Sequence, residues 1–83
     1  MLNGIAEPGD IEAILRDQLN LEPADYGNDL LESGLLDSLA LVQLIMHIEN
    51  HYDVVLPIDD LEFENFRSVE TICSLVNRLR AGA

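Results

Sequence analysis

The stretch from Ser38 to His51 is predicted to be a helix with apolar side chains on two nearly opposite sides. At about 100° per residue, one stripe has the i, i+3, i+4, i+7 spacing of a face that packs into a core. That stripe comprises Leu41, Leu44, Ile45 and Ile48. The other side carries Leu39, Val42 and Met46, interleaved with Gln43, Glu49 and Asn50. Exposed apolar residues rimmed by polar ones mark a contact surface, whereas the alternative is a central helix buried on both sides.

Two further segments combine apolar residues at helical spacing with a capping residue. Asp10 is the expected N-cap of a helix over about residues 10–20, and Ser68 that of a helix over about residues 69–80. The first helix places Ile11, Ile14, Leu15 and Leu19 on one face, and the last places Val69, Ile72, Leu75, Val76 and Leu79. Arg78 and Arg80 suit the C-terminal dipole of the last helix.

The segments between these helices lose the apolar period. Residues 20–34 hold Pro23, Gly27 and Gly34 and predict a long loop. Its expected anchors into the core are Leu30, Leu31, Leu35 and Leu36. Residues 54–56 (VVL) are interpreted as an extended connector, because the chain offers them no partner strand. We expect a short acidic helix over residues 59–66, with Leu61 pointing inward.

Together these elements predict an all-α fold. It is a small four-helix bundle with three main helices, one short helix and a long first loop. We expect one domain over residues 1–83, with residues 1–8 as a flexible tail. The chain shows no basic-then-apolar leader, and no apolar run approaches the roughly 20 residues of a membrane span. Cys73 is the single cysteine, so we expect a buried thiol, no internal disulfide and a cytoplasmic location.

The charge of the chain is strongly one-sided. Sixteen acidic residues face four arginines and no lysine, which gives a net charge of −12. Between Asp17 and Phe66 no Lys or Arg occurs. This charge repels nucleic acid and anionic membranes and steers basic partner surfaces toward the domain.

Ser38 stands where the long loop becomes a helix, directly after Asp37. On physical grounds a Ser or Asp at this boundary is an N-cap. Activation as a nucleophile would need a base, but His47 and His51 lie about two and a half turns or more further along the same helix. A helix N-terminus does favour a phosphate group. Ser38 is therefore well placed to carry a phosphodiester made by another enzyme.

From about Ile11 to Leu79 the chain resembles the acyl carrier proteins. The likeness rests on GLLDSL at residues 34–39, IE at 48–49, LPIDD at 56–60 and FxSVxxI at 66–72. The resemblance implies an acyl-carrier-like bundle and a single carrier domain rather than an enzyme. Fatty-acid carriers usually have more acids along this helix, where the present chain has Ala40, Gln43 and Asn50. The GLLDSL run is also similar to freestanding D-alanyl and other aminoacyl carriers.

The resemblance also implies functional residues. A phosphopantetheinyl transferase would use coenzyme A to attach 4'-phosphopantetheine to Ser38, and Asp37 would assist the magnesium-dependent transfer. The arm would hold acyl groups as thioesters for fatty acid or secondary metabolite biosynthesis. Leu39, Val42, Met46 and Glu49 would form the partner-docking face. The further partners would be an acyl- or aminoacyl-loading ligase and acyl-processing enzymes, and the protein would be a monomer.

Two alternatives belong to other classes of function. The net charge also suits an acidic decoy that binds a basic enzyme cleft without any modification. A small metal-binding regulator could use His47 and His51, which are one turn apart, or the acids of residues 59–64. The sequence supplies no third ligand beside the histidines and no calcium-binding loop pattern, so we expect no metal site.

Overall fold

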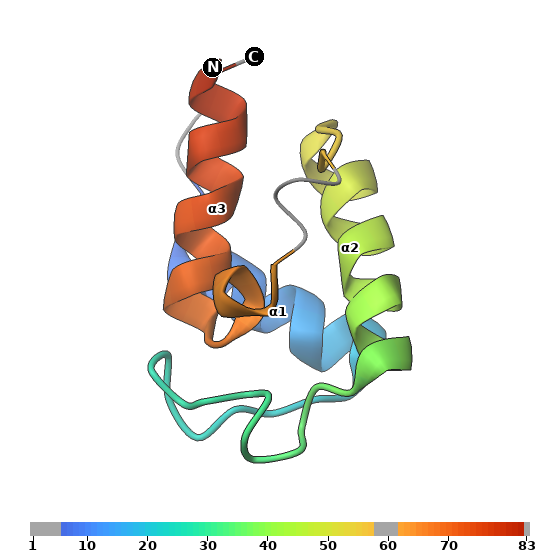
Figure 1. Ribbon diagram of the computed structural model, residues 1–83, viewed down its shortest axis with the longest axis vertical. Helices are drawn as coiled ribbons and strands as arrows, with labels where there is room; N and C mark the ends of the chain where they lie inside the picture. Colours follow the sequence, from blue (N-terminus) through green and yellow to red (C-terminus); the bar gives the residue numbers. More distant parts are fainter. Residues whose placement is uncertain (1–5, 58–61, 83) are drawn as a thin grey trace.

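The computed structural model describes residues 6–57 and 62–82, and every regular element among them is helical (Figure 1). These elements are α1 (Pro8–Leu19), α2 (Ser38–Tyr52), the short 3-10 helix η2 (Phe63–Phe66) and α3 (Val69–Gly82). In Figure 1, α2 and α3 stand upright with α1 across them, and α1 contacts both more extensively than they contact each other. The predicted all-α bundle is confirmed. No described helix is long and apolar enough to cross a membrane.

The core is built from the three apolar stripes that the sequence predicts. Each of the three long helices contributes side chains that are 0% exposed. These are Ile11 and Leu15 of α1, Leu44 and Ile48 of α2, and Val69, Ile72, Leu75 and Val76 of α3. Leu41 and Ile45 are half-buried against the same cluster. Cys73 lies in this core at 7% exposed, as expected, and Arg80 of α3 stacks over the ring of Tyr52 at the end of α2.

The N-terminal part of the fold differs from the prediction in two respects. Helix α1 begins at Pro8, because proline is already set for a first helical position, and Glu7 is its N-cap. Asp10 is therefore not the cap: its carboxylate accepts a hydrogen bond from the Glu7 N–H at 3.0 Å, from inside the first turn. The expected tail is wrong for residues 6–8, since Ala6 is only 3% exposed. Residues 1–5 lie outside the described residues.

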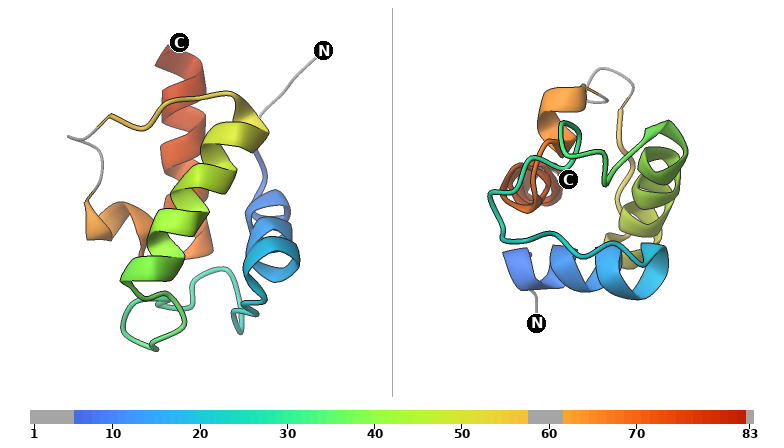
Figure 2. Two further views of the ribbon diagram at one scale, coloured as in Figure 1. Left: turned by 90° about the vertical axis from the view of Figure 1, so that its right-hand side faces the viewer. Right: turned by 90° about the horizontal axis from the view of Figure 1, so that it is seen from below.

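The long loop is anchored by leucines, as predicted. Leu30 and Leu36 are 1% and 3% exposed, and Leu31 and Leu35 pack half-buried against the core. The Leu36 N–H donates to the Leu30 carbonyl at 2.9 Å, which closes a compact turn before α2 (Figure 2). These contacts fix the position of the loop directly before the start of α2.

The segments around α3 also follow the sequence closely. Residues 54–57 form a connector without regular secondary structure, and Leu56 is buried in the core. The Ser68 hydroxyl accepts from the Thr71 N–H at 3.3 Å, which confirms Ser68 as the cap of α3. Within the described residues, the predicted acidic helix is a 3-10 turn over Phe63–Phe66, and Glu62 before it is not helical. Leu61, Asp59 and Asp60 lie outside the described residues.

Candidate functional site at the start of α2

At the start of α2, the residue that caps the helix and the candidate functional residue are different side chains. Asp37 is the N-cap, and its Oδ1 accepts from the Ala40 N–H at 2.8 Å. Ser38 is the first helical residue and is exposed. Within residues 6–57 and 62–82, no group hydrogen-bonds the Ser38 hydroxyl. Since Asp37 does the capping, the hydroxyl of Ser38 is left available for chemistry.

The position of Ser38 fits a phosphodiester better than it fits a nucleophile of hydrolysis. The first N–H groups of α2 and the positive end of its dipole lie beside the hydroxyl and favour a phosphate there. His47 and His51 are on the same helix, roughly 14 Å or more further along its axis. Neither imidazole can take the Ser38 proton. An exposed hydroxyl without an adjacent base requires another enzyme to modify it.

The second apolar stripe of α2 is on the surface. Leu39, Val42 and Met46 are 68%, 55% and 56% exposed, whereas Leu44 and Ile48 are completely buried. This observation excludes the alternative of a central helix buried on both sides. The exposed stripe begins directly beside Ser38 and continues for two turns toward the C-terminus of α2. A protein that reaches the hydroxyl would meet this apolar surface.

Glu49 has a structural contact that the sequence analysis missed. Its Oε2 accepts a hydrogen bond from the Leu56 N–H at 3.0 Å, and the residue is half-buried. The carboxylate therefore holds the connector against α2. Because Ala40, Gln43 and Asn50 are uncharged, the exposed side of α2 carries little charge around the apolar stripe.

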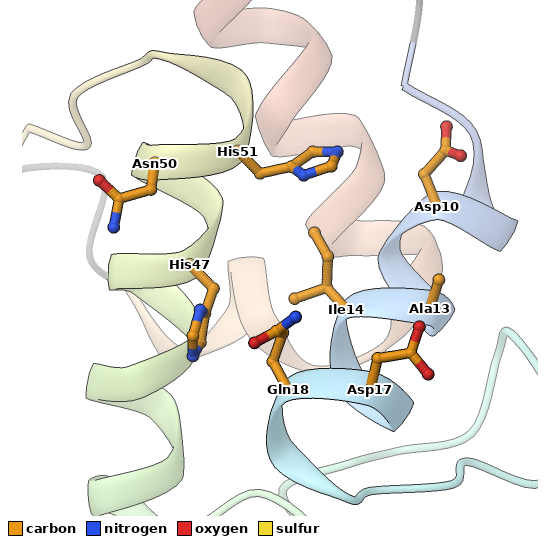
Figure 3. Close-up of a pocket in the computed structure, with 8 residues that line it drawn as sticks. All are labelled: Asp10, Ala13, Ile14, Asp17, Gln18, His47, Asn50 and His51. Atoms are coloured by element: carbon orange, nitrogen blue, oxygen red, sulfur yellow. The ribbon is translucent and has the colours of Figure 1, made fainter.

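The two histidines line a separate cavity of about 370 Å³ between α1 and α2 (Figure 3). Gln18 of α1 extends toward His47, and the carboxylate of Asp17 is turned away from it. Among the residues with described positions, no three His, Cys, Asp or Glu side chains are arranged to hold a metal ion. The acidic residues Asp59 and Asp60 lie outside that set.

An ion-pair cluster behind the loop also escaped the sequence analysis. Arg67 pairs with Asp29 at 2.7 Å and with Glu64 at 2.6 Å. The hydrogen bonds from the Glu32 N–H and from the Arg67 guanidinium lower the pKa of Asp29, and the bond from Arg67 lowers the pKa of Glu64. One signal was present in the sequence: Arg67 is the first cationic residue after fifty positions without one. A lone arginine after such an acidic stretch is a candidate for an ion pair with one of the preceding carboxylates.

Comparison with known proteins identifies the class that this fold and site define. Residues 9–76 match the family model of the phosphopantetheine attachment site, and the chain belongs to this family. It is a phosphopantetheine-binding carrier protein, and its cofactor is covalently attached 4'-phosphopantetheine. The Ser38 hydroxyl at the start of α2 is exposed and has no hydrogen-bond partner in the described part of the chain, and these two properties suit such a group. The family to which the sequence points is thereby confirmed.

Three individual relatives are D-alanyl carrier proteins. The D-alanyl carrier protein of Streptococcus mutans is 33% identical over 52 residues, which are 63% of this chain and 66% of that protein. The D-alanyl carrier protein of Streptococcus uberis is 36% identical, again over 63% of this chain and 66% of that protein. The D-alanyl carrier protein of Bacillus subtilis is 31% identical over 63% of this chain and 67% of that protein. The matches thus span just under two thirds of the streptococcal relatives.

Proposed function

We propose that Ser38 is the attachment residue and that the chain carries a small acyl or aminoacyl group as a thioester between partner enzymes. The observation that supports this assignment most directly is the contrast between two serines at helix starts. Ser68 is 6% exposed and bonded to Thr71, whereas Ser38 is exposed and its hydroxyl has no partner among the described residues. Of these two serines, Ser38 is the one accessible to a transferase.

At Ser38 the chain only has to present a hydroxyl to another enzyme. A phosphopantetheinyl transferase replaces the Oγ–H bond of Ser38 by an Oγ–P bond, and the nucleotide half of coenzyme A and one proton leave. Asp37 lies next to the hydroxyl and would help to place the magnesium ion of this reaction. The attached arm supplies a thiol that bears the cargo, so the protein needs no catalytic groups of its own.

We propose a D-alanyl or similarly small aminoacyl group as the cargo. The relatives described above support this choice, and so does the uncharged outer side of α2, which departs from the acidic pattern of fatty-acid carriers. An adenylating ligase would load the arm. Fatty acyl cargo is the second candidate, and loading assays with each class of ligase distinguish them. We expect the protein to act as a monomer in the cytoplasm, where coenzyme A is available.

We further propose that partner enzymes dock on the exposed stripe of Leu39, Val42 and Met46, with Glu49 at its edge. The net charge of −12 attracts basic surfaces from a distance, and a small apolar contact then holds them briefly. Such docking is fast and reversible, as a carrier that visits several enzymes requires. The acidic decoy receives no support from the family to which the chain belongs.

Intact-mass measurement tests the assignment. The apo protein is incubated with coenzyme A, Mg²⁺ and a phosphopantetheinyl transferase of broad specificity. The wild type should gain the mass of one phosphopantetheine, and Ser38→Ala should gain none. Ser33→Ala and Ser74→Ala are matched controls at exposed serines and should be modified normally. An unmodified wild type, or a modified Ser38→Ala, would overturn the proposal.

A further inference from the structure

Arg67 lies between η2 and α3 and holds the long loop by its backbone and by its side chain. The Arg67 carbonyl accepts from the Leu30 N–H at 2.7 Å. One guanidinium nitrogen donates to Asp29 Oδ2 at 2.7 Å, and two others donate to the carboxylate of Glu64 at 3.0 and 2.6 Å. The planar fork of arginine suits such a bridge between two carboxylates. Arg67 therefore joins η2 to the loop.

Asp29 also binds the backbone of the turn that follows it, so it connects Arg67 to that turn. Its Oδ1 accepts from the Leu31 N–H at 3.1 Å and from the Glu32 N–H at 2.8 Å. The turn closes through the bond from the Leu36 N–H to the Leu30 carbonyl, and Leu30 and Leu36 are buried. Residues 29–36 thus form one braced unit, which ends one residue before Asp37.

The first turn of α2 is only partly packed against the core. Ser38 and Leu39 are exposed, whereas Ala40 and Leu41 are half-buried against the core. The completely buried residues of α2 begin at Leu44, about one and two thirds turns after Ser38. The direction in which the chain leaves the 29–36 turn therefore acts together with this partial packing to set where the Ser38 hydroxyl lies relative to η2 and α3.

We propose that Arg67 is a positioning residue for the modification of Ser38, acting through Asp29 and the 29–36 turn to fix where the hydroxyl is presented to the transferase. This inference rests on the proposed attachment at Ser38. Exposed ion pairs contribute little to global stability, and the side chains of Arg67 and Asp29 are 39% and 30% exposed. The consequence of breaking the pair should therefore be local displacement of the turn rather than unfolding.

Transferase kinetics on matched variants test the proposal. Arg67→Gln removes both ion pairs, and Asp29→Asn removes the charge that faces Arg67 while it keeps an oxygen for the two turn amides. Both should lower kcat roughly tenfold, within the ~10²-fold that a 1 Å misplacement can cost. The KM for the carrier should stay within about twofold, because the docking stripe of α2 is unchanged.

Two control variants separate positioning from general effects of charge. Glu64→Gln removes the partner of Arg67 within η2 but leaves the bond to Asp29, and its kcat should equal that of the wild type. Arg16→Gln removes an exposed pair with Asp17 on α1 and should also have no effect. Arg67→Lys, which can still reach one carboxylate, should recover part of the lost kcat.

Hydrogen exchange supplies a second readout. In Arg67→Gln and Asp29→Asn, the amides of Leu31, Glu32 and Leu36 should exchange faster, while that of Leu75 in the core should not change. Wild-type kcat in both variants would overturn the inference, as would a loss of rate that follows the loss of folded protein. Neither result affects the attachment at Ser38, which the Ser38→Ala mass measurement tests separately.

Discussion

Asn77 of α3 binds both backbone polar groups of Ala6, 71 residues earlier in the chain. The Ala6 N–H donates to Asn77 Oδ1 at 2.8 Å, and Asn77 Nδ2 donates to the Ala6 carbonyl at 3.1 Å. The Cys73 thiol donates to the same carbonyl at 3.1 Å. The segment before α1 is therefore fastened to the middle of α3, which explains why Ala6 is buried rather than part of a tail.

Asn77→Ala should destabilise the fold by about 1–3 kcal/mol, because it leaves the buried backbone groups of Ala6 short of partners. Urea unfolding measures the loss, and hydrogen exchange at the Ala6 amide should accelerate. Asn50→Ala, at an exposed position on α2, is the control and should change stability by less than about 0.5 kcal/mol. Unchanged stability together with unchanged protection of Ala6 would contradict this account.

Leu44 and Leu39 test the two faces of α2. Leu44 is completely buried, so Leu44→Ala should cost about 2–4 kcal/mol as a truncation in the core. Leu39 is 68% exposed, so Leu39→Ala should stay within about 0.5 kcal/mol of the wild type. Chemical denaturation of both variants gives the two values. The opposite order would show that the faces of α2 are reversed.

Local periodicity explains which features of the fold could be predicted from sequence. The helical spacing of Leu41, Leu44 and Ile48 depends only on neighbours within α2, whereas the exposure of the opposite stripe depends on what packs against the helix and required the structure. The start of α1 was misplaced because Asp10 and Glu7 both suit a helix start, and the proline between them decided the outcome. The predicted short acidic helix is found over Phe63–Phe66, and residues 59–61 of its expected range lie outside the described residues.

Contacts between distant residues could not be predicted in this way. Asp29 and Arg67 are 38 residues apart, and sixteen acids compete for four arginines, so the pattern alone does not select the pair. The link between Asn77 and Ala6 has no sequence signature either. Ser38 and Asp37 could be singled out because they are adjacent and lie within a recognisable run, although which of the two caps α2 required the structure.

Met46→Glu tests the proposed docking stripe. A charge placed in the middle of the apolar contact should raise the KM for the transferase roughly tenfold, the typical effect of changing a central interface residue. The melting temperature should be unchanged because Met46 is 56% exposed. Val55→Glu is the control, since it adds the same charge at a 78% exposed position on the connector. Equal effects of the two variants on KM would point to net charge rather than to docking on α2.

The ion-pair cluster around Arg67 should make a small part of the stability sensitive to acid, because its side chains are partly exposed. Bonds from the Glu32 amide and from Arg67 lower the pKa of Asp29 below its ordinary 3.8, and bonding to Arg67 lowers the pKa of Glu64 below its ordinary 4.5. A carboxyl whose folded pKa is depressed stabilises the fold above its unfolded pKa, and this contribution is lost as the pH falls through the folded value. The loss should therefore begin near pH 4.5 and continue below 3.8.

Urea unfolding of the wild type and of an Asp29→Asn, Glu64→Gln double variant between pH 6 and pH 3 measures this contribution. The difference in stability between the two proteins should shrink toward the acidic end, while the remaining carboxylates affect both equally. A stability difference that stays constant from pH 6 to pH 3 would show that the pairs with Arg67 do not stabilise the ionised forms of Asp29 and Glu64.

Cys73 should be distinguishable from the thiol of the attached arm by its reactivity. Burial raises the pKa of the Cys73 thiol, and the nearby acids Glu7 and Asp10 raise it further, so less of the reactive thiolate forms at neutral pH. The folded apo protein should therefore react slowly with a thiol reagent.

After modification, one additional thiol per chain should react fast, because the arm extends from an exposed residue. The fast phase should persist in Cys73→Ala and be absent in Ser38→Ala. A fast reaction of the folded apo protein would mean that Cys73 is accessible, contrary to its place beneath Ala6 and Asn77.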